Sequence, residues 1–300
     1  MKSRRSSKIV ASILMLAVGL SVACNRDSQT NATAKQGEDL PPRQLFGVEL
    51  QPQARALLAE IEQHYGKRLR EDVKSNLDYS YYAALASVDS DGTPSIRMDS
   101  DIPATESTIV HELLHIKLYS KGFPVIRLNY PQSLSTERQQ AHVRYIVAML
   151  YDAIIHTIIY PQAREMGLKP QESLHSQLDL IMADQFEDYA GVPRQDVRTI
   201  YYLNAALLLD DRELFERVTD AYIRRHWYES VAIGRVLADM VAAAKPSTPE
   251  EVVFVLLRCL EVIQHEINNF ELEAWQNEKR GEHILRRAVI KVIPQQRTGK

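Results

Sequence analysis

The spacing of apolar and polar positions predicts helices over most of the chain. Amphipathic spacing begins at Pro52 and ends near Gly66, which predicts a first helix. A longer apolar pattern runs from Thr136 to Tyr160, and Pro161 is expected to close that helix because proline interrupts helical hydrogen bonding. Further helices are expected over residues 171–189, 194–209, 211–225, 227–244 and 249–277.

One part of the first half has a β pattern instead. Residues 79–88 are rich in Tyr and Ala, a turn sequence Asp-Ser-Asp-Gly follows at 89–92, and residues 93–98 complete a predicted hairpin. We expect the sheet of the protein within residues 67–100, whereas residues 283–293 could form a last helix or a strand. The predicted fold class is α+β and predominantly α-helical, with an irregular helical bundle in the second half.

The first residues have the pattern of an export signal. Four basic residues among the first eight precede an uncharged run at 9–20, which is too short to cross a bilayer as a mature helix. Residues 21–24, Ser-Val-Ala-Cys, resemble a bacterial lipoprotein signal, in which the cysteine becomes the lipidated first residue. This resemblance implies a membrane anchor at Cys24. Cleavage after Ala23 without lipidation is the alternative and would give a soluble periplasmic or secreted protein.

Charge and cysteine content indicate whether nucleic-acid binding and disulfides are to be expected. The formal net charge of −3 gives no general attraction to phosphates, so nucleic acid is not expected as a partner. The chain has two cysteines, and if Cys24 is lipidated or removed, Cys259 has no partner for an intrachain disulfide. Residues 24–43 almost lack large apolar side chains and predict a flexible tether, because little burial offsets the entropy of ordering them.

The sequence His-Glu-Leu-Leu-His at 111–115 suggests a metal site. It lies in an apolar stretch from Ala104 to Ser120 that has no helix-breaking residue. On a helix, His111 and His115 project from the same face, so both imidazoles can reach one cation at about 2 Å. Glu112 points to the side of that pair. It can therefore take a proton from a metal-bound water without being a ligand.

A third metal ligand is expected from the long apolar helix. Asp152 and His156 interrupt its apolar pattern four residues apart, and a buried unpaired carboxylate would cost several kcal/mol. We interpret the two as one ligand and one group that orients it, with His156 as the first choice and Asp152 as the second. Glu137 is a further alternative, although its polar neighbours indicate a solvated helix start. His142, also among polar residues, is expected to face solvent.

The motif, its helix and the upstream hairpin resemble the zincin class of metallopeptidases, over about residues 75–165. The resemblance implies that His111 and His115 bind Zn²⁺, that Glu112 is the general base, and that an edge strand holds extended substrate. Leu118 and Lys121 stand where the extended metzincin signature needs Gly and His, so a metzincin is excluded. A tyrosine that stabilises the oxyanion is also typical; the sequence does not choose among Tyr160, Tyr201 and Tyr202, for which core packing is the alternative.

These patterns together predict a zinc-dependent hydrolase, a peptidase that acts on a peptide or protein substrate in the cell envelope. The expected organisation is a signal peptide at 1–23, a tether at 24–43, a zincin-like catalytic region at 44–166 and a helical region at 167–300 packed on it. The alternative function is a non-catalytic, zincin-like envelope lipoprotein that binds or scaffolds a partner. The sequence does not predict an oligomeric state.

Overall fold

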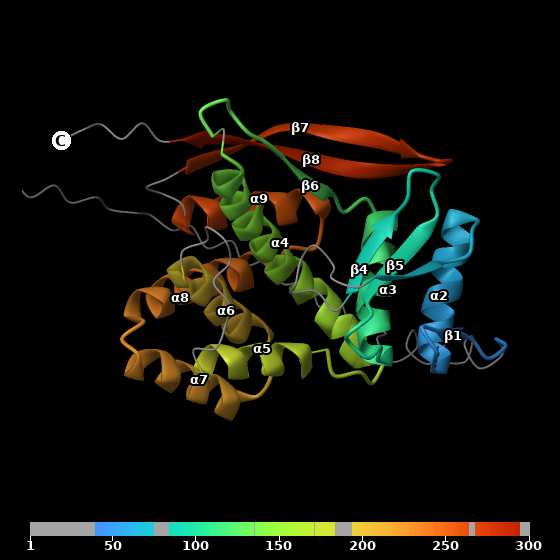
Figure 1. Ribbon diagram of the computed structural model, residues 1–300, viewed down its shortest axis with the longest axis horizontal. Coiled ribbons are helices and arrows are strands. Elements are labelled where there is room, and N and C mark those ends of the chain that lie inside the picture. The colour runs from blue at the N-terminus through green and yellow to red at the C-terminus, as the bar shows by residue number, and fades with distance from the viewer. Residues whose placement is uncertain are drawn as a thin grey trace, which may run out of the picture.

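The computed structural model describes residues 40–74, 84–134, 136–170, 172–183, 194–263 and 268–294. The predicted signal peptide, the tether up to residue 39 and the start of the predicted hairpin at 79–83 lie outside the described residues. The fold is mixed α+β and mainly helical, as the sequence predicts. Figure 1 shows helix α4 crossing the molecule between the sheet that contains β4 and β5 and the helices of the second half.

The chain begins with a short hairpin of β1 (Gln44–Leu45) and β2 (Val48–Glu49), followed by helix α2 (Pro52–Tyr65). Proline at the start of α2 costs no helical hydrogen bond, since that N–H has no partner within the helix. The buried face of α2 recurs at helical spacing, at Ala54, Leu57, Leu58, Ile61 and Tyr65. The predicted first helix is therefore confirmed.

A three-stranded sheet follows, built from β3 (Arg70–Lys74), β4 (Ala84–Val88) and β5 (Pro94–Asp99). The strand order is β3-β5-β4; β3 pairs parallel and β4 pairs antiparallel with β5. The pair of β4 and β5 confirms the described part of the predicted hairpin. Among the described strands, β4 lies at the edge of this sheet.

Two helices connect this sheet to the rest of the molecule. Helix α3 (Glu106–Ser120) begins at Thr105, whose side chain accepts a hydrogen bond from the Thr108 N–H. Helix α4 (Glu137–Glu165) packs against α3, α6 and α9. The stretch Gln139–Glu165 is long and apolar enough to cross a membrane, but 61% of its most apolar window is buried in the fold. In this structure it is a core helix.

The expectation that Pro161 closes α4 is wrong, because the helix continues to Glu165. Proline removes one helical hydrogen bond. The last turn is nevertheless held by tertiary contacts, since Ala163 is buried and Arg164 forms a 2.7 Å ion pair with Asp210 and a hydrogen bond to the Leu208 carbonyl.

The second half forms the expected irregular helical bundle. Its helices are α5 (Glu172–Ala183), α6 (Arg194–Leu208), α7 (Arg212–Arg224), α8 (Tyr228–Ala244) and α9 (Pro249–Ile263). The first four of these agree with the predicted ranges to within a few residues in the part of the chain that the structure describes. The predicted helix over 249–277 is wrong beyond Ile263.

A long hairpin of β7 (Asn268–Arg280) and β8 (His283–Pro294) replaces the end of that predicted helix. Asn268 and Phe270 are buried while Asn269 is exposed, which is the period of two of a strand. Strand β8 also pairs in parallel with β6 (Val125–Asn129), in the order β6-β8-β7. The expectation of one sheet within residues 67–100 is therefore wrong, and one sheet joins the regions predicted at 44–166 and 167–300.

The tip of the C-terminal hairpin meets the turn between β4 and β5 (Figure 1). The Gly281 N–H donates to the Ser90 carbonyl at 3.2 Å. A Cβ atom on Gly281 would lie 2.1 Å from the Asp91 carbonyl oxygen, and one on Gly92 would lie 2.6 Å from the Arg280 carbonyl oxygen. Both glycines are therefore required by the close approach of the two backbones.

Candidate metal centre

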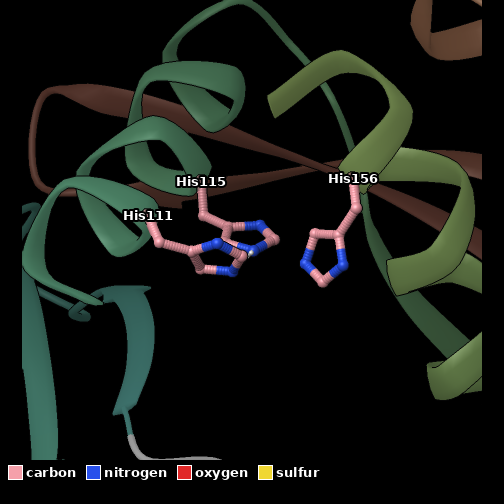
Figure 2. A group of neighbouring side chains, drawn as sticks. All are labelled: His111, His115 and His156. Carbon is pink, nitrogen blue, oxygen red and sulfur yellow. Dashed lines mark hydrogen bonds between the residues drawn. The ribbon is translucent and has the colours of Figure 1, made fainter. Parts of the chain in front are cut away.

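Three histidines from two helices converge at one place. His111 and His115 lie one turn apart on α3, and His156 faces them from α4 (Figure 2). One potential ligand atom from each of the three lies within 4.8 Å of the others. The Nε2 atoms of His111 and His115 are 3.2 Å apart, and the rings of His111 and His156 have centroids 4.7 Å apart. The structure thus groups His156, the first choice for third ligand, with the histidines of the motif.

The cluster favours neutral imidazoles. Burial lowers the pKa of His111 from 6.5 to about 4. Burial also lowers the pKa values of His115 and His156, and neighbouring imidazoles of the cluster lower them further. Neutral imidazole is the form that binds metals, because its free nitrogen lone pair is the ligand. At neutral pH the three side chains are therefore ready to coordinate a cation.

The hydrogen bonding of His156 fits a metal better than a structural role. Its Nε2 atom is buried and has no hydrogen-bond partner among the described residues. A buried nitrogen left without a partner costs about 1–3 kcal/mol. A cation held jointly with His111 and His115 would give this nitrogen a partner, so the residues present fit a metal ion.

Tyr160 lies beside the cluster. Its ring is one helical turn beyond His156 and stacks on that imidazole, with centroids 5.0 Å apart and planes 19° apart. Tyr160 is 4% exposed. Of the three tyrosines considered from the sequence it is the one near the histidines, since Tyr201 and Tyr202 lie on α6, and the Tyr202 hydroxyl bonds to that of Thr219 at 3.0 Å.

Glu112, the general base that the motif predicts, is 7% exposed. Burial raises its pKa from 4.5 to about 8; the nearby negative charge of Asp152 adds to this, and a hydrogen bond from the Ala86 N–H opposes it. Ala86 is on β4, which packs against α3. The contact between this backbone amide and Glu112 is not visible in the sequence, because it depends on which way the strand turns its N–H groups.

Asp152, the second choice for third ligand, is not part of the histidine cluster. Its negative charge instead raises the pKa values of Glu112, Tyr119 and Tyr151. Glu137 is exposed at the start of α4 and lies about 28 Å along the helix axis from His156, so it is no ligand of this site.

The expectation that His142 faces solvent is wrong. Its Nε2 atom lies 2.9 Å from the Asp196 carboxylate on α6, and the two side chains are 13% and 14% exposed. Polar neighbours in the sequence hide this pairing, because the partner lies 54 residues along the chain. His142 therefore joins two helices and does not approach the histidine cluster.

A cavity of about 650 Å³ lies apart from the histidines, between α5 and α7. It is lined by Asp179, Met182, Ala183, Arg217, Ala221, Arg224 and Arg225. None of the cluster residues lines it, so its size says nothing about the chemistry of the metal centre.

No protein-family model, no curated protein and no solved structure matches the chain. The sequence motif and the geometry of the three histidines therefore carry the functional argument.

Proposed function

We propose that this protein is a zinc-dependent hydrolase that cleaves amide bonds, a peptidase with His111, His115 and His156 as the metal ligands. The observation that carries the proposal is the convergence of a third buried imidazole from α4, its Nε2 without a partner among the described residues, on the two histidines of the motif. Three protein ligands with one remaining position are typical of catalytic zinc, whereas structural zinc sites are closed by four. The absence of thiolate and carboxylate from this ligand set is compatible with zinc.

A bound zinc ion would polarise the scissile carbonyl and lower the pKa of a water molecule in the fourth position. The protein supplies the proton transfer. Glu112, next to the ligand His111 and buried, takes the proton of the attacking water and delivers it to the leaving amine. A divalent cation held by the three histidines would favour the carboxylate form that this role needs, against the effect of burial.

The free edge of β4 supports a peptide as the substrate. This strand lies at the edge of its sheet among the described strands and packs against the helix of the motif. An extended peptide can bind such an edge as an added strand, with its backbone held by main-chain hydrogen bonds. We further propose that the substrate lies in the cell envelope, reached from a lipid anchor at Cys24; labelling with palmitate, lost in Cys24→Ser, tests that anchor.

The variant Glu112→Gln tests the proposal. The zinc-loaded wild-type protein is expected to hydrolyse an unstructured peptide. Glu112→Gln is expected to bind one zinc per chain, and its kcat should be lower than that of the wild type by a factor of about 100 or more. Elemental analysis gives the zinc content, and peptide turnover gives the rate.

Two results would contradict the proposal. If the wild-type protein does not bind zinc, the proposed metal centre is wrong. A zinc-binding protein on which Glu112→Gln has no effect supports the binding or scaffold lipoprotein instead, because such a protein does not use the base.

A further inference from the structure

The N–H group of Ala86 points to the edge of β4 that pairs with no other described strand. In an antiparallel pair, hydrogen-bonded and non-hydrogen-bonded residue pairs alternate. The Asp89 N–H donates to the Thr93 carbonyl at 2.9 Å, so that pair is hydrogen-bonded. Three pairs further along, Ala86 is opposite Ile96 in a non-hydrogen-bonded pair. The Ala86 N–H is therefore directed away from β5.

Glu112 meets this N–H at the edge. Helix α3 packs against β4, and the Glu112 carboxyl group accepts a hydrogen bond from the Ala86 N–H. The direction of the amide, derived from the strand register, and the position of the carboxyl group agree. The residue with the role of general base in the proposed function is thus bound to the strand edge that an extended substrate would use.

The Ala86 N–H cannot donate a full hydrogen bond to the Glu112 carboxyl group and to a peptide carbonyl at the same time. A peptide that adds to β4 as a strand takes its hydrogen bonds from the outward N–H groups of alternate residues, here Ala84, Ala86 and Val88. Binding of the peptide across Ala86 therefore displaces the Glu112 carboxyl group. A small substrate without an extended backbone leaves the contact in place.

We propose that the Ala86 N–H holds Glu112 on the edge of β4 in the free protein, and that an extended peptide backbone pairing with β4 releases it to act as the base. The inference rests on the proposed function and deepens it. It makes extended polypeptide the preferred substrate class, because only such a substrate both occupies the edge and frees the carboxylate. Ala86 is then a positioning residue that acts through its main chain.

The variant Ala86→Pro removes this N–H alone, since proline is tolerated on an edge strand where the N–H faces away from the sheet. The zinc-loaded variant and wild type are compared on p-nitrophenyl acetate and on an unstructured peptide. For the ester, kcat/KM is expected to rise about fivefold, the worth of one hydrogen bond. For the peptide it should not rise, because the wild-type protein already releases Glu112 when the peptide binds.

Ala84→Pro is the matched control. Its N–H faces the same edge two residues away but is not among the donors to Glu112, so the fivefold rise in ester hydrolysis should be absent. Peptide binding should weaken, because the peptide loses one main-chain donor. An Ala86→Pro variant with unchanged or slower ester hydrolysis overturns the inference, because a contact that only positions the base would slow both substrates when removed. A wild-type protein that hydrolyses neither substrate refutes the proposed function instead.

Binding of a non-cleavable extended peptide tests the same competition without turnover, and without the proline variant. Glu112→Ala removes the competing acceptor, so the peptide is expected to bind about fivefold more tightly than to wild type. Calorimetric titration measures the two affinities. Equal or weaker binding to Glu112→Ala overturns the inference.

Discussion

Helix α4 carries two half-buried histidines that differ in their partners. Near its start, the His142 ring lies 2.9 Å from the Asp196 carboxylate and bridges two helices. Fourteen residues later, His156 has a buried Nε2 atom without a hydrogen-bond partner among the described residues, and its ring faces two further imidazoles. Residue type and helix are shared, so the surrounding groups decide the role. The Nε2 atom of His142 is already paired with a carboxylate and is not available to a cation, whereas the Nε2 atom of His156 has no hydrogen-bond partner among the described residues.

The largest expected contrast is in metal affinity. His156→Ala removes one of the three proposed ligands and is expected to weaken zinc binding more than about 1,000-fold, since the remaining pair cannot fix the ion. His142→Ala, on the same helix, is expected to change it less than about threefold. Competition with a chromophoric chelator measures both. Similar affinities in the two variants would show that the difference between the histidines has no bearing on metal binding.

Acid should affect the metal-free protein through the cluster. Because burial lowers the pKa of His111 to about 4, the unfolded chain binds this proton more readily than the folded one. The stability from His111 is thus present above pH 6.5 and is lost as pH falls toward 4, by about 3 kcal/mol. Glu112, with a raised pKa, acts in the opposite sense, so the comparison is between variants.

The variant His111→Asn isolates that contribution. Between pH 6.5 and 4 the wild type is expected to lose about 3 kcal/mol more unfolding free energy than His111→Asn in urea titrations without metal. If the unfolding free energies of wild type and His111→Asn change with pH in the same way, the burial of the cluster is contradicted.

Tyr160 gives the next smaller effect, because it contacts the proposed ligand His156 and is not itself a proposed ligand. Tyr160→Leu removes the ring that stacks on His156 and should weaken zinc binding about 10- to 100-fold, the usual effect of losing a group that orients a ligand. Tyr160→Phe keeps the ring and should stay within about threefold of wild type. Tyr201→Leu is the matched control, since both tyrosines are 4% exposed. Equal losses from Tyr160→Leu and Tyr201→Leu would indicate a general packing effect.

The sequence predicts local features of the molecule better than distant ones. The motif helix, the hairpin of β4 and β5 and the choice of His156 all follow from periodicity and from the cost of burying a polar group. The pairing of His142 with Asp196 and the contact of Gly281 with Ser90 join segments far apart in the chain, and no local pattern encodes them. The strand β7 was predicted as helix because residues 268–277 also fit a helical continuation of α9.

The smallest effect concerns the paired histidine itself. A double-mutant cycle of His142→Ala and Asp196→Ala should give a coupling free energy of about 1 kcal/mol in urea unfolding, as expected for one partly buried hydrogen-bonded pair. The cycle cancels the other contacts of Asp196, so the coupling reports the pair alone. Zinc affinity should stay at the wild-type value in all three variants. A coupling near zero would mean that the carboxylate does not satisfy His142, and the contrast with His156 would then rest on geometry alone.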